Sequence, residues 1–208
     1  MNNILKSLKE NFNINISHLT NYKCNFIVHC ASDIKLLKLT PIPPQRILFA
    51  HCAKEHLISQ GFNFIDRYNC TLKNEPFITF DGKIYTLCDY YLGKECDFND
   101  KNDLKKAAEN LAILHVKSQN YAPSSIEYSK TDLFLLPQIF EKRLREIKKI
   151  KKIAQNRRNS FDVKVMEYID FFYEIGSKAN HMLKHSKYID LCHLTKQNKS
   201  FCHNDFSY

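Results

Sequence analysis

Several features that define other classes of protein are missing from this 208-residue sequence. No apolar run approaches the roughly 18 residues that a helix needs to cross a bilayer, so no membrane is expected as a partner. The first residues lack the charged start, apolar block and small-residue cleavage site of a signal peptide, so we expect the protein to stay inside the cell that makes it. Internal repeats and a Gly/Ser-rich linker are also missing, which argues against a repeat array or flexibly tethered domains.

The eight cysteines include no CxxC pair. A chain of this length can bury a core without disulfide bonds, and we therefore expect reduced thiols. Four cysteines each neighbour a histidine, but adjacent residues diverge on a strand or a helix and seldom bind one ion together. Zinc binding is the alternative, although no ligand spacing fits it, and our predicted site contains no metal ligand.

The net charge of +9 is concentrated between Glu141 and Arg158, where nine basic residues accompany two acidic ones. A nucleic-acid-binding protein can carry such a basic run. Apolar residues recur at helical spacing within the same stretch, so we favour an amphipathic helix with a solvated basic face, with nucleic-acid binding as the alternative. The apolar positions are Phe140, Leu144, Ile147, Ile150 and Ala154.

Short strand-like runs dominate the first 90 or so residues. Residues 25–30 (NFIVHC) and 34–39 (IKLLKL) are apolar segments between polar turns, as strands are. Residues 77–80 and 84–88 flank Asp81-Gly82, a dipeptide typical of tight hairpins. The sequence therefore predicts two strands and a β-hairpin in this region.

Helical periodicity marks four segments, at about residues 45–60, 103–118, 136–154 and 162–185. Pro44 suits the first turn of the first helix and Gly61 its end, while Asp103 lies near the cap of the second. The apolar stripe of the second helix is predicted to comprise Leu104, Ala107, Ala108, Leu111, Ala112 and His115. This order predicts an α+β, protein-kinase-like two-lobed fold. Its small antiparallel-sheet lobe would span residues 1–91 and its helical lobe, incomplete at the C-terminus, residues 92–208.

An enzyme that transfers a phosphoryl group must position the nucleotide phosphates and a metal ion, and it must place an aspartate near the attacking hydroxyl. Lys38, late in the 34–39 strand, is our candidate for the lysine that reaches nucleotide phosphates. Lys35 competes with it, since strand alternation alone does not decide between them. Glu55 lies on or beside the apolar stripe of the 45–60 helix, where a carboxylate needs a cation, and we expect it to pair with the strand lysine. The alternative for Lys38 is a solvated charge on an edge strand, and the alternative for Glu55 is an exposed side chain without a functional role.

Two further segments complete the candidate site. A nucleotide-binding hinge would fall where the second hairpin strand ends, and a simple strand exit is the alternative. The hinge candidates are Cys88, Asp89, Tyr90 and Tyr91. Near the other end, His203-Asn204-Asp205 matches the beginning of the kinase catalytic loop H-R-D-x-x-x-x-N, so Asp205 and His203 are the catalytic candidates. The metal-binding asparagine of that loop would fall at position 210.

The chain resembles the CotS family of spore coat proteins, which are kinase-like relatives of the aminoglycoside phosphotransferase and choline kinase group. Four stretches carry the resemblance: "QRILFAHCAKEHLISQGFNFIDRY", "GKIYTLCDYYLGKECDFND", "DLKKAAENLAILH" and "KSFCHNDFSY". The similarity covers the chain from about Leu5. It implies a sporulation protein deposited on the spore coat from the mother-cell cytoplasm, with other coat proteins as partners.

By position, the resemblance implies that Lys38 is the strand lysine, Glu55 the helix glutamate and Asp205 the catalytic aspartate, braced by His203. ATP and Mg²⁺ would serve a full-length parent, which would transfer phosphate to an unidentified hydroxyl or amine acceptor. Family members continue past this loop, so the chain resembles a truncated copy that we expect to be inactive.

The segment where a phosphate loop would lie, residues 19–33, contains no glycine. Glycine usually lets the backbone of such a loop approach the phosphates closely, so this sequence departs from the family pattern. The alternatives are therefore a scaffolding coat protein without nucleotide binding, or a basic nucleic-acid-binding protein.

Overall fold

The computed structural model describes residues 2–91, 93–122, 132–156 and 159–203. The chain divides into two compact units, Met1–Lys130 with Lys199–Tyr208, and Thr131–Asn198. The lobe boundary predicted after residue 91 stays a prediction. Within the described ranges, no helix is both long enough and apolar enough to span a membrane.

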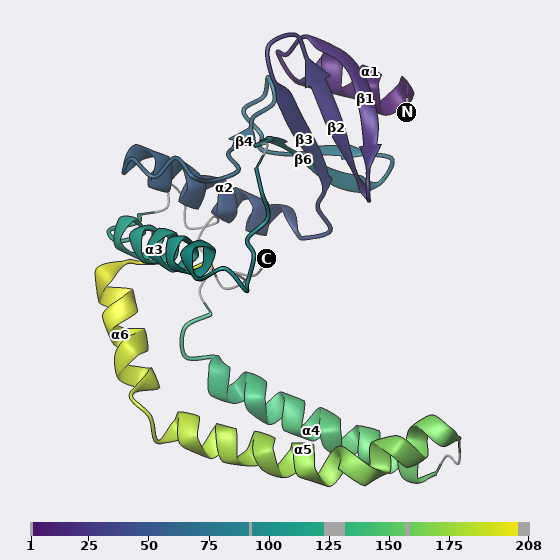
Figure 1. The fold of residues 1–208 in the computed structure, drawn as a ribbon, viewed down its shortest axis with the longest axis vertical. Coiled ribbons are helices and arrows are strands. Elements are labelled where there is room, and N and C mark those ends of the chain that lie inside the picture. Colours follow the sequence, from purple (N-terminus) through teal and green to yellow (C-terminus); the bar gives the residue numbers. More distant parts are fainter. Residues whose placement is uncertain (1, 92, 123–131, 157–158, 204–208) are drawn as a thin grey trace. The chain divides into compact units, whose positions relative to one another are not determined.

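The first unit is built on a six-stranded antiparallel sheet (Figure 1). Its strands run in the order β1 (Ile16–Tyr22), β2 (Asn25–Cys30), β3 (Ile34–Leu39), β6 (Lys83–Asp89) and β4 (Tyr68–Asn69), and β5 (Ile78–Phe80) also pairs with β6. The strands predicted at 25–30 and 34–39 are confirmed with the same bounds. β1 and β4 were not predicted.

The predicted β-hairpin is confirmed as β5 and β6. Asp81 and Gly82 both adopt positive φ, 51° and 68°, which is the backbone that a two-residue hairpin turn of the I′ kind requires. Aspartate tolerates this conformation better than most side chains, and glycine adopts it without steric cost.

Helix α1 (Asn2–Asn11) supplies one side of the main core. Its buried residues Ile4 and Leu8 fall four apart, so they share one face of the helix. They pack with inward-pointing residues of the sheet, among them Val28, Leu37 and Leu87, which are fully buried. The spacing of the apolar residues was visible in the sequence, although the helix was not predicted.

The two remaining helices of this unit are α2 (Pro44–Ser59) and α3 (Lys101–Lys117), both close to prediction. The cap of α3 is Asp100, which accepts a hydrogen bond from the backbone N–H of Asn102, while Asp103 lies in the first turn. The face of α3 that is buried in the structure differs from the apolar stripe that the sequence predicted. Leu114 is buried against Leu57 and Phe62, whereas Leu104 and His115 are exposed, because the partners of α3 determine which face is covered.

The second unit contains α4 (Leu136–Gln155), α5 (Ser160–Lys184) and α6 (Tyr188–Asn198). The helices predicted at 136–154 and 162–185 are confirmed as α4 and α5, and α6 was not predicted. α4 and α5 form an antiparallel hairpin, in which Glu141 pairs with Lys184 and Lys151 with Asp170 (Figure 1). The amphipathic helix predicted for the basic run is therefore present.

Candidate functional site

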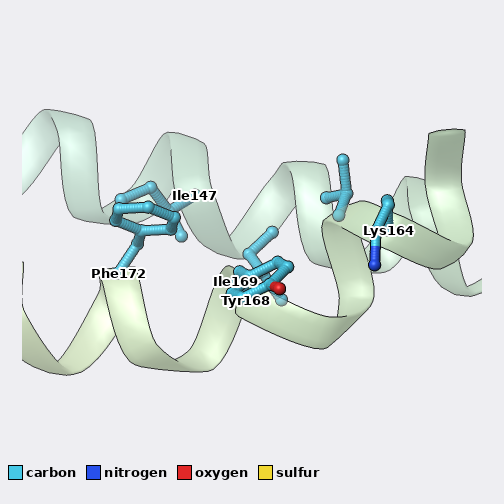
Figure 2. Close-up of a pocket in the computed structure, with 6 residues that line it drawn as sticks. Ile147, Lys164, Tyr168, Ile169 and Phe172 are labelled. Carbon is cyan, nitrogen blue, oxygen red and sulfur yellow. The ribbon is translucent and has the colours of Figure 1, made fainter.

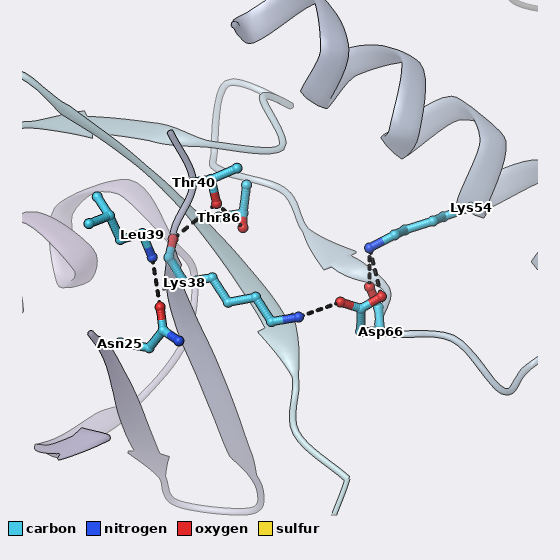
Figure 3. A network of polar contacts seen from close by, with 7 residues as sticks. All are labelled: Asn25, Lys38, Leu39, Thr40, Lys54, Asp66 and Thr86. Atoms are coloured by element: carbon cyan, nitrogen blue, oxygen red, sulfur yellow. Dashed lines mark hydrogen bonds and ion pairs between the residues drawn. The ribbon is translucent and has the colours of Figure 1, made fainter. Parts of the chain in front are cut away.

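Lys38 belongs to a three-residue charge cluster centred on Asp66 (Figure 3). Its ammonium lies 2.7 Å from Oδ2 of Asp66, in the segment between α2 and β4. Lys54 of α2 donates to Oδ1 of the same carboxylate and to the Asp66 backbone carbonyl, each at 2.8 Å. Its ammonium also lies 3.6 Å from the centroid of the Tyr68 ring, a cation–π contact. Three segments that are distant in the sequence thus converge on one carboxylate.

The electrostatics keep this cluster ionised. Burial alone would raise the pKa of Asp66, but Lys54 and Lys38 outweigh it and hold the pKa below its ordinary value. Burial would lower the pKa of Lys38, but the Asp66 carboxylate outweighs it and raises the pKa. Two lysines share one carboxylate here, and the excess positive charge suits a further anionic group.

The cluster is accessible to such a group. The side chains of Lys38 and Asp66 retain 37% and 38% of their exposure to solvent. Lys38 is therefore positioned by its partner without being enclosed.

Glu55 has a different partner from the one predicted. Its carboxylate accepts two hydrogen bonds from the guanidinium of Arg67, while Lys38 pairs with Asp66. Arg67 holds the pKa of Glu55 below its ordinary value. The expected Lys38–Glu55 ion pair is thus wrong for this structure, because adjacent residues 66 and 67 supply a separate partner to each side chain. A role for Glu55 in cofactor binding stays a prediction.

Lys35, the competitor of Lys38, lies on the opposite face of β3. Its side chain is buried and its ammonium contacts the carboxylates of Asp33 at 2.8 Å and Asp89 at 2.9 Å. Two anions outweigh the effect of burial and raise the pKa of Lys35. Lys35 is therefore a structural cation, and Lys38 is the lysine of this strand that is open to a ligand.

The four hinge candidates differ in their surroundings. Cys88 is fully buried, which raises the pKa of its thiol to about 11. The Asp89 carboxylate accepts hydrogen bonds from Lys35 and from the Asn69 side chain. The backbone N–H of Asp89 donates to Arg67, and that of Tyr90 to Ile34. Tyr91 is exposed. Nucleotide binding by these residues stays a prediction.

The catalytic candidates lie in the segment that returns to the first unit. Asp205 falls outside the described residues, and His203 is exposed. Just before them, the N–H of Tyr121 donates to the carbonyl of Lys199 at 2.9 Å. Phe201 packs against Leu57, Phe62 and Leu114, so the end of the described chain is held beside α2 and α3.

The turn between β1 and β2 occupies the position of a phosphate loop in the predicted fold. Lys23 in this turn has φ of 54°, a conformation that glycine would adopt more readily. Among the described residues, no group of three or more His, Cys, Asp or Glu side chains could hold a metal ion.

Sequence reasoning missed Asp66 and Lys54. Both lie in the first of the four stretches that carry the CotS resemblance, but no motif gave either residue a role, and Asp66 lies in an irregular segment that the strand and helix patterns leave unassigned. A further indication was the charged pair Asp66-Arg67 directly before Tyr68, the start of β4.

Comparison with solved structures identifies the class of fold. The aminoglycoside phosphotransferase from Alicyclobacillus acidocaldarius subsp. acidocaldarius DSM 446 superposes with a TM-score of 0.62 at 16% identity, over 85% of this chain and 52% of that one. The spectinomycin phosphotransferase APH(9)-Ia, solved in an AMP-bound complex, gives a TM-score of 0.59 at 12% identity, over 89% of this chain and 58% of that one. The protein therefore has the kinase-like fold of these phosphotransferases, as predicted.

Sequence comparison adds a more specific relative. Spore coat protein S of Bacillus subtilis (strain 168) is 25% identical over 174 residues, which are 83% of this chain and 49% of that protein. The predicted resemblance to CotS-type coat proteins is confirmed, and the chain is a homologue of spore coat protein S with a phosphotransferase-like fold. No model of a protein family matches the chain. The chain spans about half the length of this curated relative.

Proposed function

We propose that this chain belongs to a spore-coat-associated protein whose kinase-like fold binds a nucleotide through Lys38. The coat association is supported by the similarity to spore coat protein S, which extends over 83% of the chain. The proposed partners are other coat proteins, and the proposed location is the spore coat, reached from the mother-cell cytoplasm.

Nucleotide binding is supported above all by the geometry at Lys38. Its ammonium is fixed by Asp66, is partly exposed, and shares that carboxylate with Lys54. A phosphate group has oxygens to accept hydrogen bonds from both ammonium groups and would balance their excess charge. The AMP-bound state of spectinomycin phosphotransferase makes an adenine nucleotide with Mg²⁺ the natural first ligand to test.

The test is a thermal-shift titration of the 208-residue chain with ATP and Mg²⁺. We expect a concentration-dependent rise in Tm, because a ligand that binds only the native state stabilises it. The rise should disappear in Lys38→Ala and persist in Lys83→Ala, which removes an exposed lysine from the same sheet. An equal rise in Lys38→Ala, or none in the unaltered chain, contradicts the proposal.

Phosphoryl transfer to a hydroxyl or amine acceptor is the reaction that we propose for the whole protein. Catalysis of this reaction depends mainly on positioning and charge stabilisation, to which Lys38 would contribute by holding phosphate oxygens. Asp205 and His203 are the proposed catalytic pair. The measurement is ATP consumption with candidate acceptors, and turnover that survives Asp205→Asn would remove this residue from the mechanism.

A scaffolding coat protein is the second candidate function. The observation that favours it is the set of large apolar side chains that are exposed on α4 and α5, since exposed apolar surface often marks a site of protein interaction. Figure 2 shows two of them, Tyr168 and Phe172, which line a groove between the two helices. Absence of any nucleotide effect on Tm would leave this function as the better supported one.

A further inference from the structure

The rings of Tyr22 and Tyr90 meet across the sheet of the first unit. Tyr22 ends β1 and Tyr90 directly follows β6, and the ring centroids lie 6.3 Å apart at an interplanar angle of 64°, an edge-to-face contact. In the order of the sheet, β2 and β3 lie between β1 and β6 (Figure 1). The contact therefore passes over two intervening strands and holds the end of β1 near the hinge candidates.

Tyr22 lies on the face of the sheet that carries Lys38. Residues paired across a ladder share a face, and successive residues of a strand alternate between faces. Leu37 faces the core with α1, so its neighbour Lys38 lies on the opposite face. Phe26 pairs with Leu37, so its neighbour Asn25 also lies on that opposite face. Tyr22 pairs with Asn25 and belongs to the same face.

Tyr90 belongs to this face as well. Asp89 pairs with Lys35, which lies on the core side of β3, so the next residue, Tyr90, lies on the other side. The N–H of Tyr90 donates to the carbonyl of Ile34 at 3.2 Å, which continues the ladder one residue beyond β6. Both rings of the contact are thus on the face from which Lys38 would bind a ligand.

The turn between β1 and β2 keeps Tyr22 close to the sheet. Tyr22 is half-buried, whereas Lys23 and Cys24 in the turn itself are exposed. The ammonium of Lys23 lies 5.7 Å from the centroid of the Tyr22 ring, so this ring has a neighbour in the turn as well as at the hinge. A turn at the position of a phosphate loop therefore contacts the hinge segment through a side chain.

A nucleotide held as proposed would need the space that the Tyr22 ring occupies. With its phosphates at Lys38 and its base at the hinge candidates, it would lie along this face and reach Tyr90. The two rings are in contact and are not parallel, so no base fits between them as they stand. The base would have to displace Tyr22 from Tyr90, whereas a phosphate chain without a base would not.

We propose that the Tyr22–Tyr90 contact is autoinhibitory, because the Tyr22 ring occupies the place of the nucleotide base and must move away before a nucleotide binds. This inference rests on the proposed nucleotide binding at Lys38 and describes a regulation of that site. A nucleotide then binds only the fraction of molecules in which the contact is open, and its apparent Kd exceeds the intrinsic Kd by the reciprocal of that fraction. Both rings belong to the first unit, so their contact does not involve the second.

The experiment compares ATP and tripolyphosphate, each with Mg²⁺, by isothermal titration calorimetry of the 208-residue chain. Tyr22→Ala should tighten the binding of ATP about two- to tenfold, the factor that corresponds to an edge-to-face contact between two rings. It should leave the affinity for tripolyphosphate unchanged, because that ligand has no base to compete with the ring. Circular dichroism of each variant shows whether the fold persists.

Two matched variants are the controls. Tyr22→Phe keeps the ring and should bind ATP as the unaltered chain does. Asn21→Ala truncates the exposed neighbour on the other face of β1 and should also have no effect. In a chain labelled with ¹³C at the tyrosine rings, the NMR signals of Tyr22 are assigned by their loss in Tyr22→Phe. These signals should shift when ATP is added but not when tripolyphosphate is added.

Equal or weaker ATP binding by Tyr22→Ala, when the unaltered chain binds ATP, would overturn this inference alone. An equal gain for ATP and for tripolyphosphate would also overturn it, because the ring would then restrict access to Lys38 and not to the place of the base. Failure of the proposed function has a different signature. Either the unaltered chain does not bind ATP, or Lys38→Ala binds it as tightly as the unaltered chain, and the inference then fails with it.

Discussion

The ammonium of Lys38 and the carboxylate of Asp66 are joined at 2.7 Å, although they lie 28 residues apart in the sequence. The strand that carries Lys38 ends before α2, and Asp66 follows α2, so the pair ties the sheet to the segment beyond the helix. Lys54 joins the helix itself to the same carboxylate. The cluster is thus both a candidate ligand site and a tertiary link.

Asp66→Asn should destabilise the first unit by about 1–2 kcal/mol at pH 7, a value reduced from that of buried charged pairs because the cluster is partly exposed. The folded-state pKa of Asp66 is depressed, so its stabilising contribution is present above the unfolded-state pKa and is lost as pH falls through the folded one. Urea unfolding at a series of pH values from about 7 to about 3, a range that includes the ordinary aspartate pKa, measures this dependence. The difference between the two proteins should shrink toward the acid end, and the exposed control Glu95→Gln should show little difference throughout.

Lys35→Met should cost about 2 kcal/mol, less than a fully buried ion pair because water can reach the two remaining carboxylates. Methionine keeps the apolar stem of the side chain and removes the charge that Asp33 and Asp89 share. Lys83→Met, at an exposed position of β6, is the control. Equal urea midpoints for the two variants would show that the Lys35 ion pairs contribute little.

Phe201→Ala should destabilise the first unit by about 1–3 kcal/mol, below the cost for a fully buried phenylalanine because this ring is half-buried. The ring packs with Tyr121, whose centroid lies 5.1 Å away, and with the cluster of Leu57, Phe62 and Leu114. Phe64→Ala, which truncates an exposed ring beside Phe62, should change stability by less than about 0.5 kcal/mol. A similar loss in both variants would mean that residues 199–203 are not held by this packing.

Gly176→Leu should loosen the α4–α5 hairpin by about 1–3 kcal/mol, the usual cost of overpacking. A Cβ at residue 176 would lie 3.0 Å from Cδ2 of Leu144, and a larger side chain would displace that leucine. Leu144→Ala in the same chain should recover part of the loss. Thermal unfolding followed by far-UV circular dichroism in a double-mutant cycle provides the test, and strictly additive effects would contradict the contact.

Strands, turns and helices could be predicted wherever neighbouring residues alone determine the backbone conformation. The 25–30 and 34–39 strands follow from short apolar runs between polar turns, and the Asp81-Gly82 turn follows from backbone preference; both signals operate over a few residues. The helices at α4 and α5 follow from long apolar periodicity. The order of these elements indicated the kinase-like fold class, and the resemblance to CotS-type proteins agreed with it.

The partners of the charged residues could not be predicted in the same way. Lys38 and Glu55 were expected to meet, but Asp66 and Arg67 intervene from an irregular segment whose path depends on tertiary packing. The face of α3 that is buried depends likewise on Leu57 and Phe62, which lie far away in the sequence. Alternation placed Lys35 and Lys38 on opposite faces of β3, yet only the observed carboxylates show which lysine is engaged in structural ion pairs.

The hydrogen bond from the N–H of Tyr121 to the carbonyl of Lys199 joins two segments of the first unit that precede and follow the second unit in the sequence. The second unit, Thr131–Asn198, is thus an insertion in the sequence of the first. An inserted unit of this kind can change in length, or be replaced by another helical unit, without altering the sheet or the Lys38–Asp66–Lys54 cluster of the first unit. The hairpin of α4 and α5 could thus diversify in its associations independently of the lysine-bearing scaffold.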